Sequence, residues 1–142
     1  QSKPTDSEYW CVRIGDWSCP WNRQLAKERK SKNLSWIEQP QTIHEVGSTF
    51  TVQGFDLNYV GVIIGPSVKY RNGKIIFDIS ESKNKSAVQN RKLESGEMIN
   101  YGETLLRNEL NVLLTRGVNG LYVYAVDEEL QNVLKKAIGN RK

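Results

Sequence analysis

The stretch from residue 58 to residue 66 decides the fold class, and it runs Asn58-Tyr-Val-Gly-Val-Ile-Ile-Gly-Pro66. Its central residues form a continuous apolar segment between turn-forming residues. Such a segment is typical of a parallel strand that is buried on both faces. A second strand of this kind is predicted from Leu121 to Val126. Two such strands in one chain indicate an α/β protein if helices connect and flank them.

Two helices are predicted around the second strand. Leucines at helical spacing predict the first over Glu103–Thr115, with Gly117 and Gly120 ending it. Asp127 is expected to cap the second helix. The apolar face of that last helix is formed by Leu130, Val133, Leu134, Ala137 and Ile138.

Shorter elements are predicted from local patterns. Alternation predicts a strand over Tyr9–Ile14, followed by a loop over Asp16–Asn22, and a short strand is expected at residues 35–37. The pair Asn72-Gly73 predicts a tight hairpin between strands at 68–70 and 74–79. Residues 81–95 are polar and predict a loop or a poorly packed helix.

Together these elements predict an α/β fold with three layers, in which a mainly parallel sheet has helices on both faces and an inserted β-hairpin. We expect residues 1–8 to be a flexible tail and residues 9–142 to form one domain. Because the sequence does not begin with Met, we also expect a fragment of a larger protein.

Composition excludes several classes of protein. The 142 residues contain no apolar run long enough to cross a bilayer, so no membrane association is expected. Cys11 and Cys19 are too few for a disulfide scaffold, which favours a reducing cytoplasm. A net charge of +4 permits binding to polyanions, although the basic residues between Arg23 and Lys32 are expected to form an ordinary solvated surface.

The sequence also limits the chemistry. His44 is the only histidine, so neither a zinc site nor a nucleophile with a histidine base is expected. No G-x-x-x-x-G-K-[ST] loop is present, so the chain lacks the usual cradle for a triphosphate and Mg²⁺. Any role in ATP chemistry must therefore depend on a site supplied by another domain.

Two segments, residues 47–66 and 111–127, resemble motifs V and VI of superfamily 1 helicases. The wider resemblance covers about residues 9–127. It is to UvrD/RecD/Schlafen-like P-loop ATPases, and especially to a group of uncharacterised bacterial P-loop proteins. The resemblance implies the C-terminal RecA-like half of such an ATPase. The N-terminal Walker-containing domain of the same protein would then bind ATP with Mg²⁺, and this fragment alone would bind no cofactor and be inactive.

The resemblance also assigns nucleotide-binding residues. Arg116 matches an arginine that meets the γ-phosphate, and its guanidinium could project from a helix end as a fork for phosphate oxygens. Asp56 matches an acid that bonds the ribose, although capping of a turn is an alternative. Gly54 is expected to permit close backbone approach, and Gln53 either contacts phosphate or sugar or packs in a turn.

Nucleic-acid contacts are implied for the hydroxyls of Ser48, Thr49 and Thr51. Phe50 departs from the family pattern, because a histidine that links nucleic acid to nucleotide is common there, and Phe50 is expected in the core. Three tyrosines in the predicted strands are expected to pack rather than to stack on bases, namely Tyr59, Tyr122 and Tyr124.

The function implied is therefore that of the second RecA-like domain of an ATP-dependent helicase or translocase acting on single-stranded DNA or RNA. The alternative is a binding module for nucleic acid or protein that has lost motor activity but retains a helicase scaffold. An independent nuclease is not expected, because the acidic residues show no recognisable spacing.

Overall fold

The computed structural model describes residues 9–26, 29–31, 33–84, 89–92 and 98–139. The predicted tail at 1–8 and much of the polar stretch 81–95 lie outside these residues. The chain divides into two compact units, which we call unit 1 (Gln1–Phe55) and unit 2 (Asp56–Lys142). The single domain predicted over 9–142 stays a prediction, and each unit is described by itself.

Unit 1 opens with a β-hairpin. Strand β1 (Cys11–Ile14) pairs antiparallel with β2 (Trp17–Pro20), with Ile14 opposite Trp17. The first strand was predicted, but the loop predicted over 16–22 is wrong, because most of it is β2. Gly15 adopts a φ of +54°, which allows the two-residue turn and returns the chain to a second strand at once.

Short helices follow the hairpin in unit 1. They are the 3₁₀ helices η1 (Arg29–Ser31), η2 (Trp36–Glu38) and η3 (Pro40–His44) and the single-turn helix α1 (Thr49–Val52). The strand predicted at 35–37 is therefore wrong. Ser35 precedes η2, and its backbone N–H donates to Glu38 Oε2 at 2.9 Å, so local capping overrides the β propensity of Trp36 and Ile37.

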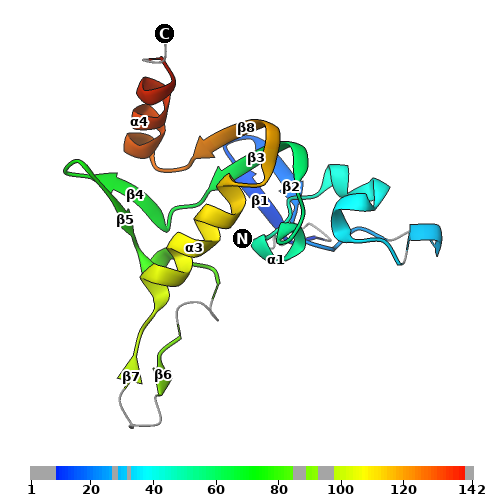
Figure 1. Ribbon diagram of the computed structural model, residues 1–142, viewed down its shortest axis with the longest axis horizontal. Coiled ribbons are helices and arrows are strands. Elements are labelled where there is room, and N and C mark those ends of the chain that lie inside the picture. The colour runs from blue at the N-terminus through cyan, green and yellow to red at the C-terminus, as the bar shows by residue number, and fades with distance from the viewer. Residues whose placement is uncertain (1–8, 27–28, 32, 85–88, 93–97, 140–142) are drawn as a thin grey trace. The chain divides into compact units, whose positions relative to one another are not determined.

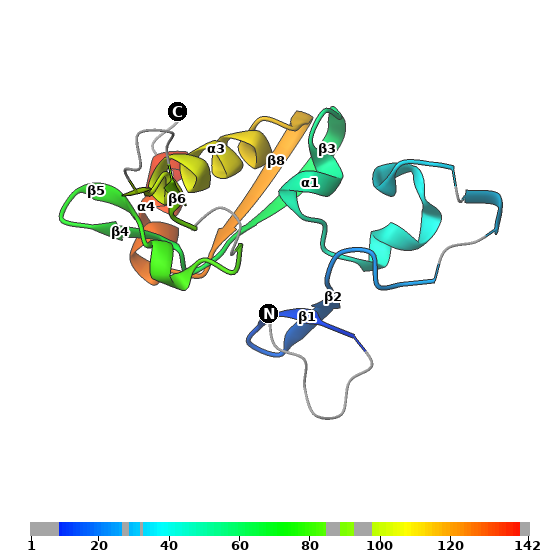
Figure 2. The ribbon, with the colours of Figure 1, turned by 90° about the horizontal axis from the view of Figure 1, so that it is seen from below.

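Unit 2 is built on one pair of parallel strands, β3 (Leu57–Ile64) and β8 (Gly117–Ala125). Helix α3 (Gly102–Leu114) precedes β8, and helix α4 (Glu128–Gly139) follows it. Figure 2 shows β3 and β8 side by side with α3 beside them. Both predicted helices and the parallel direction of the strands are confirmed, although Gly117 and Gly120 belong to β8 rather than to a separate break.

Between β3 and α3 lies the predicted hairpin of β4 (Val68–Arg71) and β5 (Lys74–Phe77). Asn72 and Gly73 have φ values of 51° and 79°, as a turn of this kind requires. The connection continues through η4 (Ile79–Glu81) and the short antiparallel pair β6 (Arg91–Lys92) and β7 (Met98–Ile99). Figure 1 shows the β4–β5 hairpin and the strands β6 and β7.

The core of unit 2 lies on one face of the parallel pair. Val62 and Ile64 of β3 are buried with Ala125 of β8. Both helices contribute to the same cluster, through Leu130 of α4 and through partly buried leucines of α3. Among the described residues, α3 and α4 thus pack on one face of β3–β8, and the helix expected on the second face is not observed.

The second face of β3–β8 is exposed. Side chains alternate along a strand, so the residues between the core positions point the other way. Tyr59, Tyr122 and Tyr124 lie on this side and are 64%, 69% and 42% exposed. The burial predicted for both strands is therefore wrong on this face, and the three tyrosines are exposed, with the Tyr59 ring close to Gly120.

Asp127 fixes the last helix to the hairpin. Its Oδ1 accepts from Leu130 N–H at 3.0 Å, so it caps α4 as predicted. The same carboxylate accepts two hydrogen bonds from Arg71, at 3.0 and 2.7 Å, and one from the Tyr70 N–H at 3.2 Å. One side chain therefore joins the start of α4 to β4.

Candidate functional site

The parallel register brings two predicted site residues together. Leu57 is paired with Gly117 at the start of both strands, so the residues just before them, Asp56 and Arg116, are neighbours. The Leu57 N–H donates to the carbonyl oxygen of Arg116 at 2.8 Å. The side chains form an ion pair with 3.8 Å between Arg116 Nη1 and Asp56 Oδ1. We call this pair and its surroundings the amino-terminal edge of the sheet.

The Arg116 side chain turns back onto the helix that precedes it. Its Nε donates to the carbonyl of Val112 at 3.1 Å, and Nη2 donates to Thr115 Oγ1 at 3.1 Å. A cation at the carboxyl end of a helix is stabilised by the free carbonyls and by the helix dipole. The arginine thus lies at a helix end, as predicted, but it contacts its own helix and its side chain is 23% exposed.

Asp56 is held much less tightly. Its side chain is 77% exposed, so its ion pair with Arg116 lies in solvent and contributes at most about 1 kcal/mol. Because a carboxylate at this position is free to change partners, it is suited to a second hydrogen-bonding ligand such as a hydroxyl group.

The glycine between helix α1 and the amino-terminal edge has a conformational role. Gly54 adopts a φ of +86°, which side chains other than glycine rarely adopt, and a Cβ built there would meet nothing within 4 Å. The close backbone approach predicted at Gly54 stays a prediction. The Gln53 N–H donates to Thr49 O at 2.9 Å, and the exposed Gln53 ends α1.

The three hydroxyls predicted to contact nucleic acid differ in accessibility. Thr51 is 4% exposed, and its Oγ1 donates to the Ser48 carbonyl at 2.7 Å and accepts from the Ser48 N–H at 2.8 Å. That hydroxyl therefore stabilises the turn itself. Ser48 and Thr49 are half-buried, and Phe50 is 71% exposed, so its predicted place in the core is wrong.

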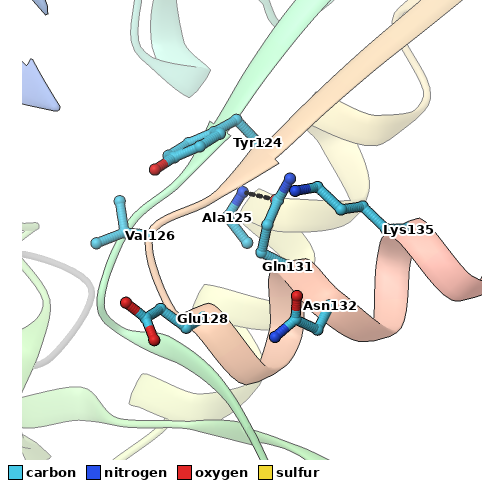
Figure 3. A pocket seen from close by; sticks show the side chains of 7 residues that line it. All are labelled: Tyr124, Ala125, Val126, Glu128, Gln131, Asn132 and Lys135. Carbon is cyan, nitrogen blue, oxygen red and sulfur yellow. Dashed lines mark hydrogen bonds between the residues drawn. The ribbon is translucent and has the colours of Figure 1, made fainter. Parts of the chain in front are cut away.

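Sequence reasoning did not identify a hollow at the opposite, carboxyl end of β8. It has a volume of about 240 Å³ and is formed by the end of the strand and the first turns of α4. Figure 3 shows Tyr124, Gln131 and Lys135 around it, and the Ala125 N–H donates to Gln131 Oε1 at 2.7 Å. The polar groups come from a helix face, which no short motif reveals.

The described parts of the chain bear on metal binding and on membrane spanning. No group of three or more His, Cys, Asp or Glu side chains that could hold a metal ion is found there. Within the same residues, none of the helices has the length and apolar character needed to span a membrane.

Comparison with known proteins shows that this α/β chain is helicase-like. Residues 1–127 match the family model of the Schlafen group 3 DNA/RNA helicase domain, and the chain belongs to this family. It is 39% identical over 131 residues to the uncharacterized protein YPL245W of Saccharomyces cerevisiae, which covers 91% of this chain. The chain spans only 28% of the length of that relative. No solved structure matches it significantly.

Proposed function

We propose that this chain is the second RecA-like half of a Schlafen-type, superfamily 1 helicase-like ATPase. In this proposal the sheet continues beyond β3 and β8 into a three-layer fold, and residues 47–66 and 111–127 serve as motifs V and VI. The observation that carries the proposal is the pairing of Leu57 with Gly117, because it sets Asp56 beside Arg116. A motor of this kind would work in the cytoplasm on single-stranded DNA or RNA.

At the amino-terminal edge, Arg116 supplies the positive charge. In the proposed complex, ATP with Mg²⁺ is bound by a Walker-containing domain of the same protein, and Arg116 reaches its γ-phosphate. To do so, the guanidinium must leave the Val112 carbonyl and Thr115. Both are neutral acceptors, whereas phosphate oxygens are charged and fit the planar fork of the guanidinium bidentately, so a phosphate near Arg116 favours the exchange.

The residues around Arg116 have supporting roles in the proposal. Asp56 accepts a hydrogen bond from the ribose once Arg116 has moved, which its exposure permits. In unit 1, Gln53 and Gly54 are proposed to contact nucleotide, and Ser48 and Thr49 to contact nucleic-acid phosphates. Thr51 is left out of these contacts, because both its donor and its acceptor are used by Ser48.

The test is ATP hydrolysis by the longer protein, with and without single-stranded DNA or RNA. Arg116→Ala should lower turnover by about 10³-fold or more, as expected for an arginine finger, while ATP binding is retained. The control is Arg107→Ala, which removes an arginine within α3 that is 58% exposed and paired with Glu103. Equal turnover of wild type and Arg116→Ala would refute the assignment. Absence of hydrolysis in wild type would favour the non-motor binding module.

A further inference from the structure

Phe50 is the most exposed aromatic residue among the described residues of unit 1, at 71%. The turn that carries it is otherwise well packed, because Thr51 and Val52 are 4% and 7% exposed. A Cβ built on Gly47 would come within 2.7 Å of the Trp36 ring, so the start of the turn lies against that ring. The packing of the turn therefore depends little on the Phe50 side chain. Single exposed apolar residues are common on protein surfaces, so the surroundings of the ring decide its role.

The backbone that presents the Phe50 ring is fixed by hydrogen bonds. Thr51 Oγ1 accepts from the Ser48 N–H and donates to the Ser48 carbonyl, and the Thr51 N–H donates to the same carbonyl at 2.9 Å. The Gln53 N–H closes the turn onto the Thr49 carbonyl. A ligand that meets the ring does not have to order the turn first, which lowers the entropic cost of binding.

The surroundings of Phe50 are suited to a single-stranded nucleic acid. Two residues with hydroxyl groups directly precede it in the sequence. Ser48 Oγ donates to Asn22 Oδ1 at 3.5 Å, and the next residue, Arg23, is exposed and begins the basic stretch 23–32. Surfaces that bind single strands combine exposed aromatic rings with positive charge along the backbone. Both features occur in unit 1, on either side of the Ser48 hydroxyl.

We propose that Phe50 stacks on one base of a single-stranded DNA or RNA while Ser48 and Thr49 contact the adjoining phosphate. This inference rests on the proposed function, which places nucleic-acid phosphates at these two hydroxyls, and it adds the contact with the base. A phenyl ring offers no hydrogen bond to a base edge, so the contact contributes affinity with little sequence preference. Arg23 contributes a charge contact that weakens as salt is raised.

The test is binding of a fluorescein-labelled oligothymidylate to the longer protein, measured by fluorescence anisotropy without ATP. An abasic strand of the same length keeps the sugar–phosphate backbone and is the matched ligand. Phe50→Ala should weaken binding of oligothymidylate by about tenfold, through the loss of one stacked base, and leave binding of the abasic strand unchanged. Phe50→Trp keeps an aromatic ring and should retain the affinity of wild type. Oligouridylate in the same assay separates RNA from DNA.

The control is Ile43→Ala in η3. Ile43 is apolar and 82% exposed in the same unit, but it has no ring to stack on a base. Ile43→Ala should leave binding of both strands unchanged. Phe50→Ala should also keep the wild-type slope of affinity against salt concentration, because the ring neutralises no phosphate.

Equal binding of oligothymidylate by wild type and Phe50→Ala would overturn the inference. An equal loss of affinity for the abasic strand would also overturn it, because the ring would then act through the turn rather than on a base. The assay needs no ATP hydrolysis, so failure of the arginine-finger assignment leaves the base contact untouched. If wild type binds neither strand, the base contact and the phosphate contacts of the proposed function are both refuted.

Discussion

The two units of the chain are stabilised in different ways. The buried side chains described in unit 2 are apolar, and they centre on Val62, Ile64 and Leu130. In unit 1 the buried set is mostly polar: Ser31, Gln39, Thr42, Glu45 and Thr51, with Cys11 and Val52. A polar interior depends on each hydrogen bond being made, whereas an apolar one depends on filled volume. The two units should therefore respond to different substitutions.

Glu45 is the clearest example of the polar type. It is 8% exposed and accepts hydrogen bonds from Arg23 N–H, Leu25 N–H and Trp36 Nε1 at 3.2, 2.6 and 2.9 Å. These donors lie 22, 20 and 9 positions from Glu45 along the chain, so one buried carboxylate joins separate segments of unit 1. The start of α1 relies on Thr51 and Ser48 in the same manner.

The largest expected effect is in the apolar core of unit 2. Leu130 is 2% exposed, so Leu130→Ala should destabilise the unit by about 2–5 kcal/mol through lost burial and a cavity. Far-UV circular dichroism follows this loss, because α3 and α4 are the two long helices described. Ile138→Ala, near the exposed carboxyl end of the same helix, should change stability by less than about 0.5 kcal/mol. Similar losses for both variants would contradict this account of the core.

A smaller effect is expected from the polar network of unit 1. Glu45→Gln keeps the shape but replaces one acceptor by a donor, leaving a buried N–H unpaired at a cost of about 1–3 kcal/mol. Tryptophan fluorescence reports on unit 1 alone, because all four tryptophans lie in it: Trp10, Trp17, Trp21 and Trp36. Asp16→Asn, in the exposed turn of the first hairpin, is the control. An unchanged transition in Glu45→Gln would show that the network is dispensable.

The smallest effect is an acid-dependent loss in unit 2. The Lys69 ammonium lowers the pKa of Asp78 from 3.8 to about 2, and the Arg71 guanidinium holds the pKa of Asp127 well below its usual range. Since both pKa values are lower in the folded state, the stabilisation is present above pH 3.8 and is lost as the pH falls towards 2. Burial raises the pKa of Glu109, which acts in the opposite direction.

Denaturant midpoints measured between pH 5 and pH 2 would show this loss of stability, because the carboxylates of native ion pairs are protonated in roughly this pH range. Asp127→Asn should flatten the decline by circular dichroism. The tryptophan signal of unit 1 should not depend on this substitution. A decline of equal slope in wild type and Asp127→Asn would contradict the contribution of that carboxylate.

Local chemistry made part of the fold predictable. Asn72-Gly73 gave the hairpin and Asp127 the helix cap, because each acts through backbone groups a few residues away. Two of the wrong predictions, the loop at 16–22 and the strand at 35–37, also arose from local geometry. The capping of η2 by Glu38 and the turn at Gly15 depend on single local geometries that the apolar pattern of the sequence does not contain.

The geometry of the candidate site could not be predicted from the sequence. Asp56 and Arg116 were chosen by resemblance, and the register of two strands distant in sequence places them together. The return of the guanidinium to the Val112 carbonyl could not be predicted, because it depends on where α3 ends. The exposure of Tyr122 was also missed, since a buried-type strand pattern does not show which covering layer is present.

The most direct test of the central claim is the affinity of the longer protein for a transition-state mimic, ADP with aluminium fluoride and Mg²⁺, compared with ADP alone. An arginine that acts on the transferred phosphoryl group should bind the mimic and not ADP. Arg116→Ala should therefore weaken binding of the mimic by about 10²-fold or more and leave ADP affinity unchanged. Equal affinity of wild type and Arg116→Ala for the mimic would contradict the account.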